Sequence, residues 1–576
     1  MYQFEEPYNE APYDDLLEIF RRSFVDNFSL PALTDYITGK TISYGDMARR
    51  IARLHLFFEL AGIKHGDKIA LLGKNTPNWV IAFMATITYG ATIVPVLSDF
   101  NPADATHIID HSDSVLLFVA DGIFSHLNFD ELPQLRAVVS LDTRSVIADR
   151  SVPSGRRRLN THASIVKSLT RQFRNRYPNG FGPKDISYPK LDHSNTAIIN
   201  YTSGTTGFSK GVMLTLNNLL GNTVFGIRSR LHYSGSRALS FLPLAHAYGC
   251  AFDMLVPLAV GSHVTLLCKT PTPQLLLKAM RQVRPSLIIC VPLILEKIYK
   301  KVVVPLLTRK PMRWVLAVPM LDKAVYSVIR SKLVEAFGGS FEEVIVGGAP
   351  LNQEVEDFLY RIKFPFTVGY GMTECGPLIS YTPWRRFIPE SSGRTLSGIM
   401  EARILEDNTI EGPDGTRQGE IMVRGMNVMK GYYKNPEATA ATLDKDGWLH
   451  TGDMGYLGGP QNRTVFIRGR YKTMILSANG QNIYPEEIES KLSNMPYVNE
   501  CLVLERNGHL VALCHPDKDA VAQAGLTPEQ LEAAMEENRR SLNKIVAPYE
   551  NAEKIEIMPE EFEKTPKRSI RRFLYK

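Results

Sequence analysis

Short apolar runs alternate with helix-like segments through about the first 450 residues, and this alternation restricts the fold more than any other feature. Strand-like runs lie within 66–75 and at 91–97 and 115–121, while 77–88 and 103–112 carry helical patterns. Strands that are separated by helices pair in parallel and are covered by those helices on both faces. The sequence therefore predicts an α/β fold with largely parallel sheets flanked by helices.

The character of the chain changes near residue 470. A short alternating stretch at 474–484 is followed by a helical pattern at 485–495, strand-like runs at 499–505 and 510–516, and a long charged helix at about 528–542. About 105 residues of this kind are enough to fold independently. We expect a large N-terminal body at 1–468 and a small α+β C-terminal domain at 469–576.

Composition excludes several classes of protein. Of 576 residues, Lys and Arg number 66 and Asp and Glu 60, so the net charge of 66 − 60 = +6 does not indicate a nucleic-acid partner. The six cysteines have no metal-ligand spacing and predict reduced thiols, and the acidic start lacks the apolar core of a signal peptide. The uncharged stretch 79–98 is interrupted by Gly90 and Pro95, which favours a buried helix and strand over a membrane span. A cytoplasmic location is expected.

The strongest local signal is 201–212, YTSGTTGFSKGV, which follows an apolar strand and precedes a helix-like run. Glycines and small hydroxyl residues let backbone N–H groups approach a phosphate closely, and Lys210 adds a positive charge. The spacing is not that of a Walker loop. The candidate phosphate-binding residues are Thr202, Ser203, Gly204, Thr205, Thr206, Gly207 and Lys210.

This segment resembles the phosphate-binding signature of the adenylate-forming enzymes, which include acyl-CoA synthetases, peptide-synthetase adenylation domains and luciferases. Further matches follow in the order of that family: FLPLAHAYG (241–249), VGGAPL (346–351), VGYGMTECGP (368–377), GWLHTGDMG (447–455) and IRGRYKTMILSANGQNIYPEEIE (467–489). Together they cover nearly the whole chain. The resemblance implies a two-domain ligase whose C-terminal domain is mobile.

Thr373 and Glu374 place a hydroxyl beside a carboxylate, which suits a phosphate oxygen and a hard Mg²⁺ ion. The resemblance implies that Thr373 contacts the α-phosphate and Glu374 binds Mg²⁺. It also implies that His246 lines the acyl pocket; a carboxylate is already ionised near neutral pH, so His246 is not expected to act as a base. The other nucleotide and acyl positions that it implies are Gly348, Ala349, Pro350, Tyr370, Gly371, Asp453 for the ribose diol, and Arg470 for ribose and phosphate.

The implied reaction has two steps and uses ATP, Mg²⁺ and coenzyme A. A carboxylate attacks the α-phosphorus of ATP and releases pyrophosphate, and a thiol then displaces AMP to give a thioester. Between the steps the C-terminal domain is expected to rotate about Lys472, while Gly480 shapes the thiol tunnel. Where the family has a C-terminal lysine, this chain has Ser569. We expect Lys567 to take its place; a neighbouring arginine, slow adenylation or a merely basic tail are the alternatives.

The acid is expected to be a long-chain fatty acid, because the extended connection between Pro292 and Gly347 resembles that of long-chain acyl-CoA ligases; medium-chain and aromatic acids stay open. The segment 144–184 carries eight Arg and two Lys against one acid, Asp149, which suits either a solvated surface or peripheral contact with the inner face of a membrane. Three alternatives remain: an acyl-[acyl-carrier-protein] ligase, a weakly catalytic acyl-adenylate- or nucleotide-binding protein, and a membrane-surface adaptor.

Overall fold

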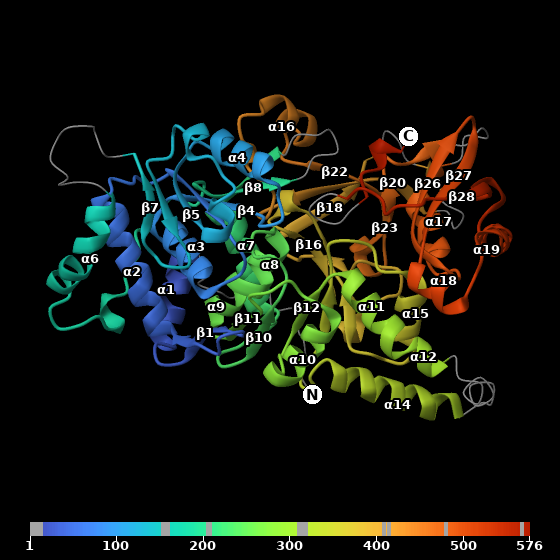
Figure 1. Cartoon of the computed structure of the whole chain (residues 1–576), viewed down its shortest axis with the longest axis horizontal. Coiled ribbons are helices and arrows are strands. Elements are labelled where there is room, and N and C mark those ends of the chain that lie inside the picture. The colour runs from blue at the N-terminus through green and yellow to red at the C-terminus, as the bar shows by residue number, and fades with distance from the viewer. Residues whose placement is uncertain are drawn as a thin grey trace.

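The computed structural model describes residues 15–150, 162–202, 210–307, 321–405, 410–411, 416–476, 482–564 and 570–575. Figure 1 shows an elongated molecule in which the large N-terminal body, from blue to orange, adjoins a smaller C-terminal domain in red. This division agrees with the predicted body and small domain. The predicted boundary at 468/469 stays a prediction, because the strand that contains it runs through Arg470 in a sheet of the body.

An eight-stranded sheet forms the first half of the body, in the order β21-β9-β8-β4-β3-β5-β6-β7. Its strands are β3 (Lys68–Leu72), β4 (Thr92–Val96), β5 (Ser114–Val119), β6 (Ala137–Ser140), β7 (Val146–Asp149), β8 (Thr196–Thr202), β9 (Lys210–Thr215) and β21 (Gly431–Tyr432). The accompanying helices are α1 (Leu16–Asp26), α2 (Tyr44–Leu60), α3 (Pro77–Tyr89), α4 (Pro102–His111), α5 (Asp121–Phe124), α6 (His162–Arg176) and α7 (Leu216–Arg228). The central strands pair in parallel, as predicted.

Successive residues of the central strands face opposite layers of helices. Ile69 and Leu71 of β3 belong to the core that includes α2 and α3, whereas Ala70 and Leu72 belong to the core that includes α4. Burial on both faces explains why the sequence shows continuous apolar runs rather than alternation. The uncharged stretch 79–98 becomes α3 and β4, so the predicted buried helix and strand are confirmed.

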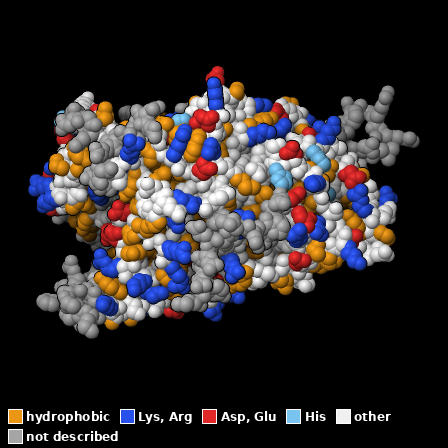
Figure 2. All heavy atoms as spheres, turned by 180° about the vertical axis from the view of Figure 1, so that it is seen from behind, with side chains coloured by type: hydrophobic (Ala, Val, Ile, Leu, Met, Phe, Trp, Pro, Cys, Tyr) orange, Lys and Arg blue, Asp and Glu red, His pale blue; other side chains and the backbone are white. Residues whose placement is uncertain are grey.

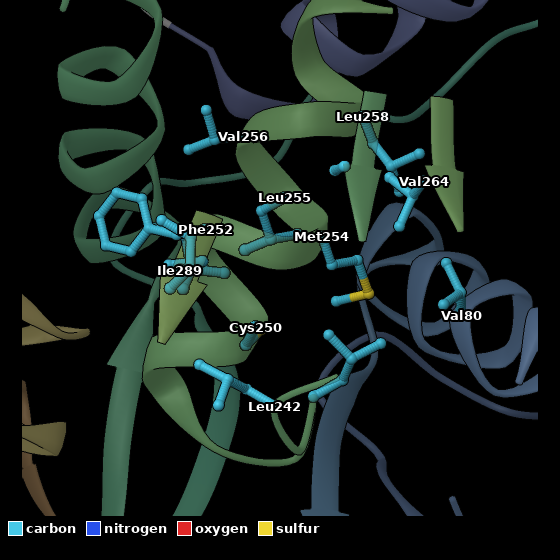
Figure 3. Close-up of a cluster of buried hydrophobic side chains, with 14 of the residues drawn as sticks. Val80, Leu242, Cys250, Phe252, Met254, Leu255, Val256, Leu258, Val264 and Ile289 are labelled. Atoms are coloured by element: carbon cyan, nitrogen blue, oxygen red, sulfur yellow. The ribbon is translucent and has the colours of Figure 1, made fainter. Parts of the chain in front are cut away.

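Two smaller sheets pack beside the first. One has the order β10-β11-β1-β2 and the other the order β12-β13-β14. The strands are β1 (Pro31–Asp35), β2 (Thr41–Ser43), β10 (Arg237–Ser240), β11 (His263–Leu266), β12 (Ile288–Cys290), β13 (Val344–Val346) and β14 (Phe366–Val368); the helices are α8 (Ala247–Gly249), α9 (Val256–Val260), α10 (Pro273–Val283), α11 (Pro292–Val302), α12 (Val304–Leu307), α14 (Leu321–Ala336) and α15 (Gln353–Arg361). Figure 3 shows apolar side chains from α3, β11 and β12 gathered around the π-helical turn Cys250–Leu255.

The last sheet of the body is antiparallel and has the order β15-β16-β17-β23-β22-β20-β18, with β19 paired to β20. Its strands are β15 (Tyr370–Gly371), β16 (Leu378–Tyr381), β17 (Arg394–Thr395), β18 (Met400–Ile404), β19 (Ile410–Glu411), β20 (Arg417–Gly425), β22 (Leu449–Gly458) and β23 (Thr464–Arg470), and α16 (Pro436–Thr442) lies between β21 and β22 in the chain. The structure thus adds an antiparallel sheet to the predicted parallel ones. Among the described residues, α16 is the only α-helix between consecutive strands of this sheet, and the other connections are short enough for antiparallel pairing.

The C-terminal domain has its own hydrophobic cores. The hairpin β24 (Ile475–Leu476) and β25 (Asn482–Ile483) leads into the sheet β26-β27-β28, and helices pack on that sheet. The elements are β26 (Val498–Arg506), β27 (His509–Pro516), β28 (Ala552–Ile557), α17 (Pro485–Leu492), α18 (Lys518–Ala524) and α19 (Pro528–Leu542). The predicted helices and strands of this domain are therefore confirmed.

Two further expectations concern the described residues. All six cysteines are free, and all except Cys268 are buried. Within the described ranges, no helix is both long and apolar enough to cross a bilayer.

Candidate active site

The predicted phosphate loop connects two paired strands. β8 and β9 are antiparallel, and Thr202 lies directly opposite Lys210 in the register. The helix-like run expected after Val212 corresponds to α7, which begins at Leu216. Between the loop and this helix lies β9, whose apolar and β-branched residues suit a strand within the sheet. Ser203, Gly204, Thr205, Thr206 and Gly207 lie outside the described residues.

Lys210 and Glu374 meet at one tyrosine. The Nζ atom of Lys210 lies 4.8 Å from the ring centroid of Tyr432, and the Tyr432 hydroxyl donates a 2.9 Å hydrogen bond to Glu374 Oε1. Burial and the neighbouring Glu374 carboxylate raise the pKa of Tyr432, so this hydroxyl stays protonated and remains a donor. Tyr432 belongs to β21, which pairs with β9. Sequence reasoning did not find Tyr432; its only signal is the pair of tyrosines after Gly431.

The turn Thr373–Cys375 that presents Thr373 and Glu374 is fixed from α7. Asn222, 1% exposed, accepts the Leu378 N–H (3.0 Å) and donates to the Cys375 carbonyl (3.3 Å). At Gly371, which precedes the turn, an added Cβ would overlap the Pro377 carbonyl oxygen, so only glycine fits there. The turn is therefore held rigidly, and its Glu374 carboxylate is joined through Tyr432 to Lys210 at the start of β9.

Asp453, Tyr370 and Arg470 form a second group. The buried Asp453 carboxylate accepts the Tyr370 hydroxyl (2.6 Å) and pairs with Arg470 Nε (2.7 Å), and Asp453 and Arg470 are register partners of β22 and β23. Burial raises the pKa of Asp453, while the Arg470 guanidinium opposes that rise and the Glu374 carboxylate adds to it. Tyr370 lies three residues before Thr373 in the chain, so this group adjoins the turn that presents Thr373 and Glu374. Arg470 is the exposed partner, so a ligand can approach from its side.

His246 precedes the short helix α8, and Tyr248 within α8 connects it to the glycine loop. The Tyr248 hydroxyl donates to the Ile345 carbonyl of β13 (3.1 Å), and a Cβ added at Gly347 would lie 3.1 Å from the Tyr248 ring. Tyr248, two residues after His246, therefore packs against Gly347, the residue before the exposed Gly348, Ala349 and Pro350. The predicted acyl-site positions thus lie on two neighbouring segments. Tyr248 was not predicted; an aromatic residue two positions after His246 was its only signal.

The structure does not join the remaining predicted residues to this site. Lys472 is exposed on the segment that links β23 to the C-terminal domain. Gly480, Lys567 and Ser569 lie outside the described residues. The segment 565–569 that holds Lys567 is bounded by a β-bridge between Lys564 and Ile570.

In this site a metal ion would be bound by one protein carboxylate and not by several protein ligands. Among the described residues, no three His, Cys, Asp or Glu side chains gather where they could hold a metal. This donor set fits Mg²⁺, which keeps several waters and binds through one or two carboxylates together with substrate phosphates. Glu374 is the residue that would hold it.

Comparison with known proteins identifies the family. Residues 21–433 match the model of the AMP-binding enzyme family. The long chain acyl-CoA synthetase 7, peroxisomal, of Arabidopsis thaliana is 30% identical over 527 residues, which cover 85% of this chain and 71% of that protein. The 4-coumarate–CoA ligase 1 of the same plant is 29% identical over 491 residues, covering 82% and 78%. The solved anthranilate CoA ligase AuaEII in complex with anthranoyl-AMP superposes with a TM-score of 0.75 at 17% identity, over 99% of this chain and 98% of that one. This chain belongs to the AMP-binding enzyme family.

Proposed function

We propose that the protein is an ATP-dependent acid–CoA ligase that forms an acyl-adenylate and then a CoA thioester. The observation that carries this proposal is that Tyr432 contacts both Lys210 and Glu374, while Asp453 is hydrogen-bonded to Tyr370 on the strand that leads into the Glu374 turn. A lysine and a carboxylate that can hold Mg²⁺ suit the triphosphate, and the buried Asp453 carboxylate suits a ribose diol.

In the first step, a carboxylate oxygen of the acid attacks the α-phosphorus of ATP, and the bond to the β-phosphate oxygen breaks to release pyrophosphate. Negative charge grows on the phosphoryl oxygens in this transition state. We propose that Lys210 and Thr373 stabilise that charge, and bound Mg²⁺ would supply further neutralisation at Glu374. In the second step, the CoA thiol attacks the acyl carbon, its proton leaves to solvent, and AMP departs.

We propose a long-chain fatty acid as the acid substrate. The extended connection between β12 and β13 supports this, since it contains α11, α12 and α14, and so does the likeness to a long-chain synthetase. Aromatic acids are the principal rivals, because 4-coumarate ligases are similarly related to this chain.

Pyrophosphate release with ATP and Mg²⁺ should be measured for fatty acids from C4 to C18 and for 4-coumarate, with and without CoA. The proposal expects the fastest release at C14–C18, coupled to thioester formation. If pyrophosphate release were fastest with 4-coumarate, the proposed substrate would be an aromatic acid instead of a long-chain fatty acid. Acyl transfer to a carrier protein but not to CoA would favour the carrier-protein ligase, and ATP binding without release would favour a binding protein.

We also propose that the protein works at an anionic membrane surface through a cluster of basic side chains on α2, the β6–β7 turn and α6. Arg53 Nη2 donates to Thr170 Oγ1 (2.6 Å), which joins the basic faces of α2 and α6. Within the described ranges, none of the cluster residues forms an ion pair: Arg50, Arg53, Arg144, Lys167, Arg171 and Arg174. Figure 2 shows that Lys and Arg side chains are spread over much of the face it presents, with Asp and Glu beside some of them.

Each basic side chain near an anionic surface contributes about 1 kcal/mol to binding. Replacing Arg50, Arg53 and Arg144 by Gln should therefore abolish sedimentation with vesicles containing phosphatidylserine. The control variant replaces three ion-paired arginines elsewhere, Arg22, Arg424 and Arg540, and should sediment like the wild type. Equal loss in both triple variants, or equal binding to neutral vesicles, would contradict a specific cluster.

A further inference from the structure

One asparagine caps two helices that belong to different domains. Asn352 precedes α15 in the body, and its Oδ1 atom accepts the N–H groups of Glu354 (3.1 Å) and Val355 (3.4 Å). These N–H groups have no partner inside the helix, so this is an ordinary N-cap. The other half of the same amide points to the C-terminal domain.

Asn352 Nδ2 donates to the Ser490 carbonyl (3.2 Å) and to Asn494 Oδ1 (2.8 Å), with Ser493 Oγ at 3.4 Å. Ser490 lies in the last turn of α17, and its carbonyl also accepts the Ser493 hydroxyl (2.9 Å), so Asn352 adds a donor from the other domain to this helix end. A single side chain therefore satisfies donors at the start of α15 and acceptors at the end of α17. The positive end of one helix dipole faces the negative end of the other, which strengthens the contact.

Asn352 is held from the side of the body. Its own N–H donates to Glu296 Oε1 of α11 (3.1 Å). Glu296 is half-buried, and burial raises its pKa while this N–H bond opposes the rise. The amide is therefore anchored by α11 and α15 before it meets the C-terminal domain.

The other end of α17 is tied to the linker between the domains. Thr473, which follows Lys472, donates to Glu486 Oε1 (2.7 Å), and Arg468 of β23 lies 3.7 Å from Glu487. Helix α17 is thus fixed by the linker at its start and by Asn352 at its end. The linker also contains Lys472, the expected hinge, so a rotation of the domain about Lys472 would have to break the hydrogen bonds of Asn352.

We propose that Asn352 is a positioning residue that latches the C-terminal domain in the orientation of this structure. The proposal rests on the two-step function above and on the rotation of the C-terminal domain between the steps that the family resemblance implies. A latch that stabilises one orientation favours the step performed there and retards the other. Loss of two neutral hydrogen bonds shifts such an equilibrium on the order of tenfold.

Asn352→Asp provides the sharpest test. The aspartate keeps the oxygen that caps α15 but replaces the donating NH₂ by an oxygen, which repels the Ser490 carbonyl and Asn494 Oδ1. Asn494→Ala removes the acceptor from the other side. Gln353→Ala is the matched control, because Gln353 bonds only within α15, to Asp357 (3.1 Å), among the described residues.

Two readouts are expected to change in both test variants and not in the control. Trypsin should cleave after the exposed Lys472 about tenfold faster, with an unchanged melting temperature. Pyrophosphate release without CoA and acyl transfer from preformed acyl-adenylate to CoA should change in opposite directions. Adding Asn494→Lys to Asn352→Asp should restore slow cleavage through a new ion pair.

Unchanged proteolysis together with an unchanged ratio of the two half-reactions would overturn the latch. A parallel fall of both half-reactions with a lower melting temperature would also overturn it and leave only a cap of α15. The proteolysis assay needs no turnover. If the Asn352 variants were cleaved faster but the protein formed no adenylate with any acid, the role of Asn352 would be supported and the proposed function would be contradicted.

Discussion

Tyr432→Phe isolates the hydrogen bond that orients Glu374. The substitution deletes the hydroxyl that donates to Glu374 Oε1 at 2.9 Å and leaves the ring 4.8 Å from Lys210. A hydrogen bond to a charged group contributes about 1.5–3 kcal/mol. If the bond is needed to present the carboxylate to Mg²⁺ in the transition state, the rate of pyrophosphate release should fall roughly 10- to 150-fold.

The assay is pyrophosphate release as Mg²⁺ is titrated at saturating ATP and acid. We expect Tyr432→Phe to need more Mg²⁺ for half-maximal rate as well as to be slower. Tyr433→Phe is the matched control, because the Tyr433 hydroxyl donates instead to Asp113 (2.6 Å). A Tyr432→Phe enzyme as fast as Tyr433→Phe, with the same Mg²⁺ dependence, would refute the role of this bond.

Further predictions concern the acids of the body. Glu374→Ala should abolish Mg²⁺-dependent adenylate formation; near-normal pyrophosphate release would remove it from the site. Arg470→Ala should raise the pKa of Asp453, because the guanidinium opposes the effect of burial, so the acidic limb of the pH–rate profile should move to higher pH. Burial raises the pKa of Glu343 to about 7 against the hydrogen bond from Tyr381. Its folded-state pKa exceeds the unfolded value, so its contribution to stability is fully present below about pH 4.5 and is lost as pH rises through about 7. Melting curves of Glu343→Gln should therefore gain on those of the wild type between pH 5 and pH 8, and a constant difference would contradict this.

The sequence predicted those parts of the structure that depend on local pattern. The helices at 77–88 and 528–542 correspond to α3 and α19, and the run 499–505 lies within β26, because periodicity and flanking residues are sufficient there. The helix-like run expected after Val212 corresponds to α7. The strand β9 was not predicted, because its pairing with β8 and β21 depends on segments that no local pattern connects.

In the candidate site as well, residues within sequence motifs were predicted, and residues that depend on tertiary contacts were not. Lys210, Glu374 and Asp453 stand in motifs that could be read directly, and Tyr432 contacts both Lys210 and Glu374. The residues that orient them come from distant parts of the chain: Asn222 from α7 and Tyr432 from β21. Each is a common polar residue without a motif, so only the folded arrangement reveals its role.

The central claim is that one site first makes an acyl-adenylate and then a thioester. It is tested most directly by rapid quenching of the enzyme with α-labelled ATP, Mg²⁺ and a C16 acid, followed by addition of CoA. We predict that labelled acyl-adenylate accumulates to about one per enzyme molecule with equimolar pyrophosphate, and that CoA converts it to AMP and acyl-CoA. Labelled ADP in place of the adenylate, or an adenylate that CoA does not discharge, would contradict the account.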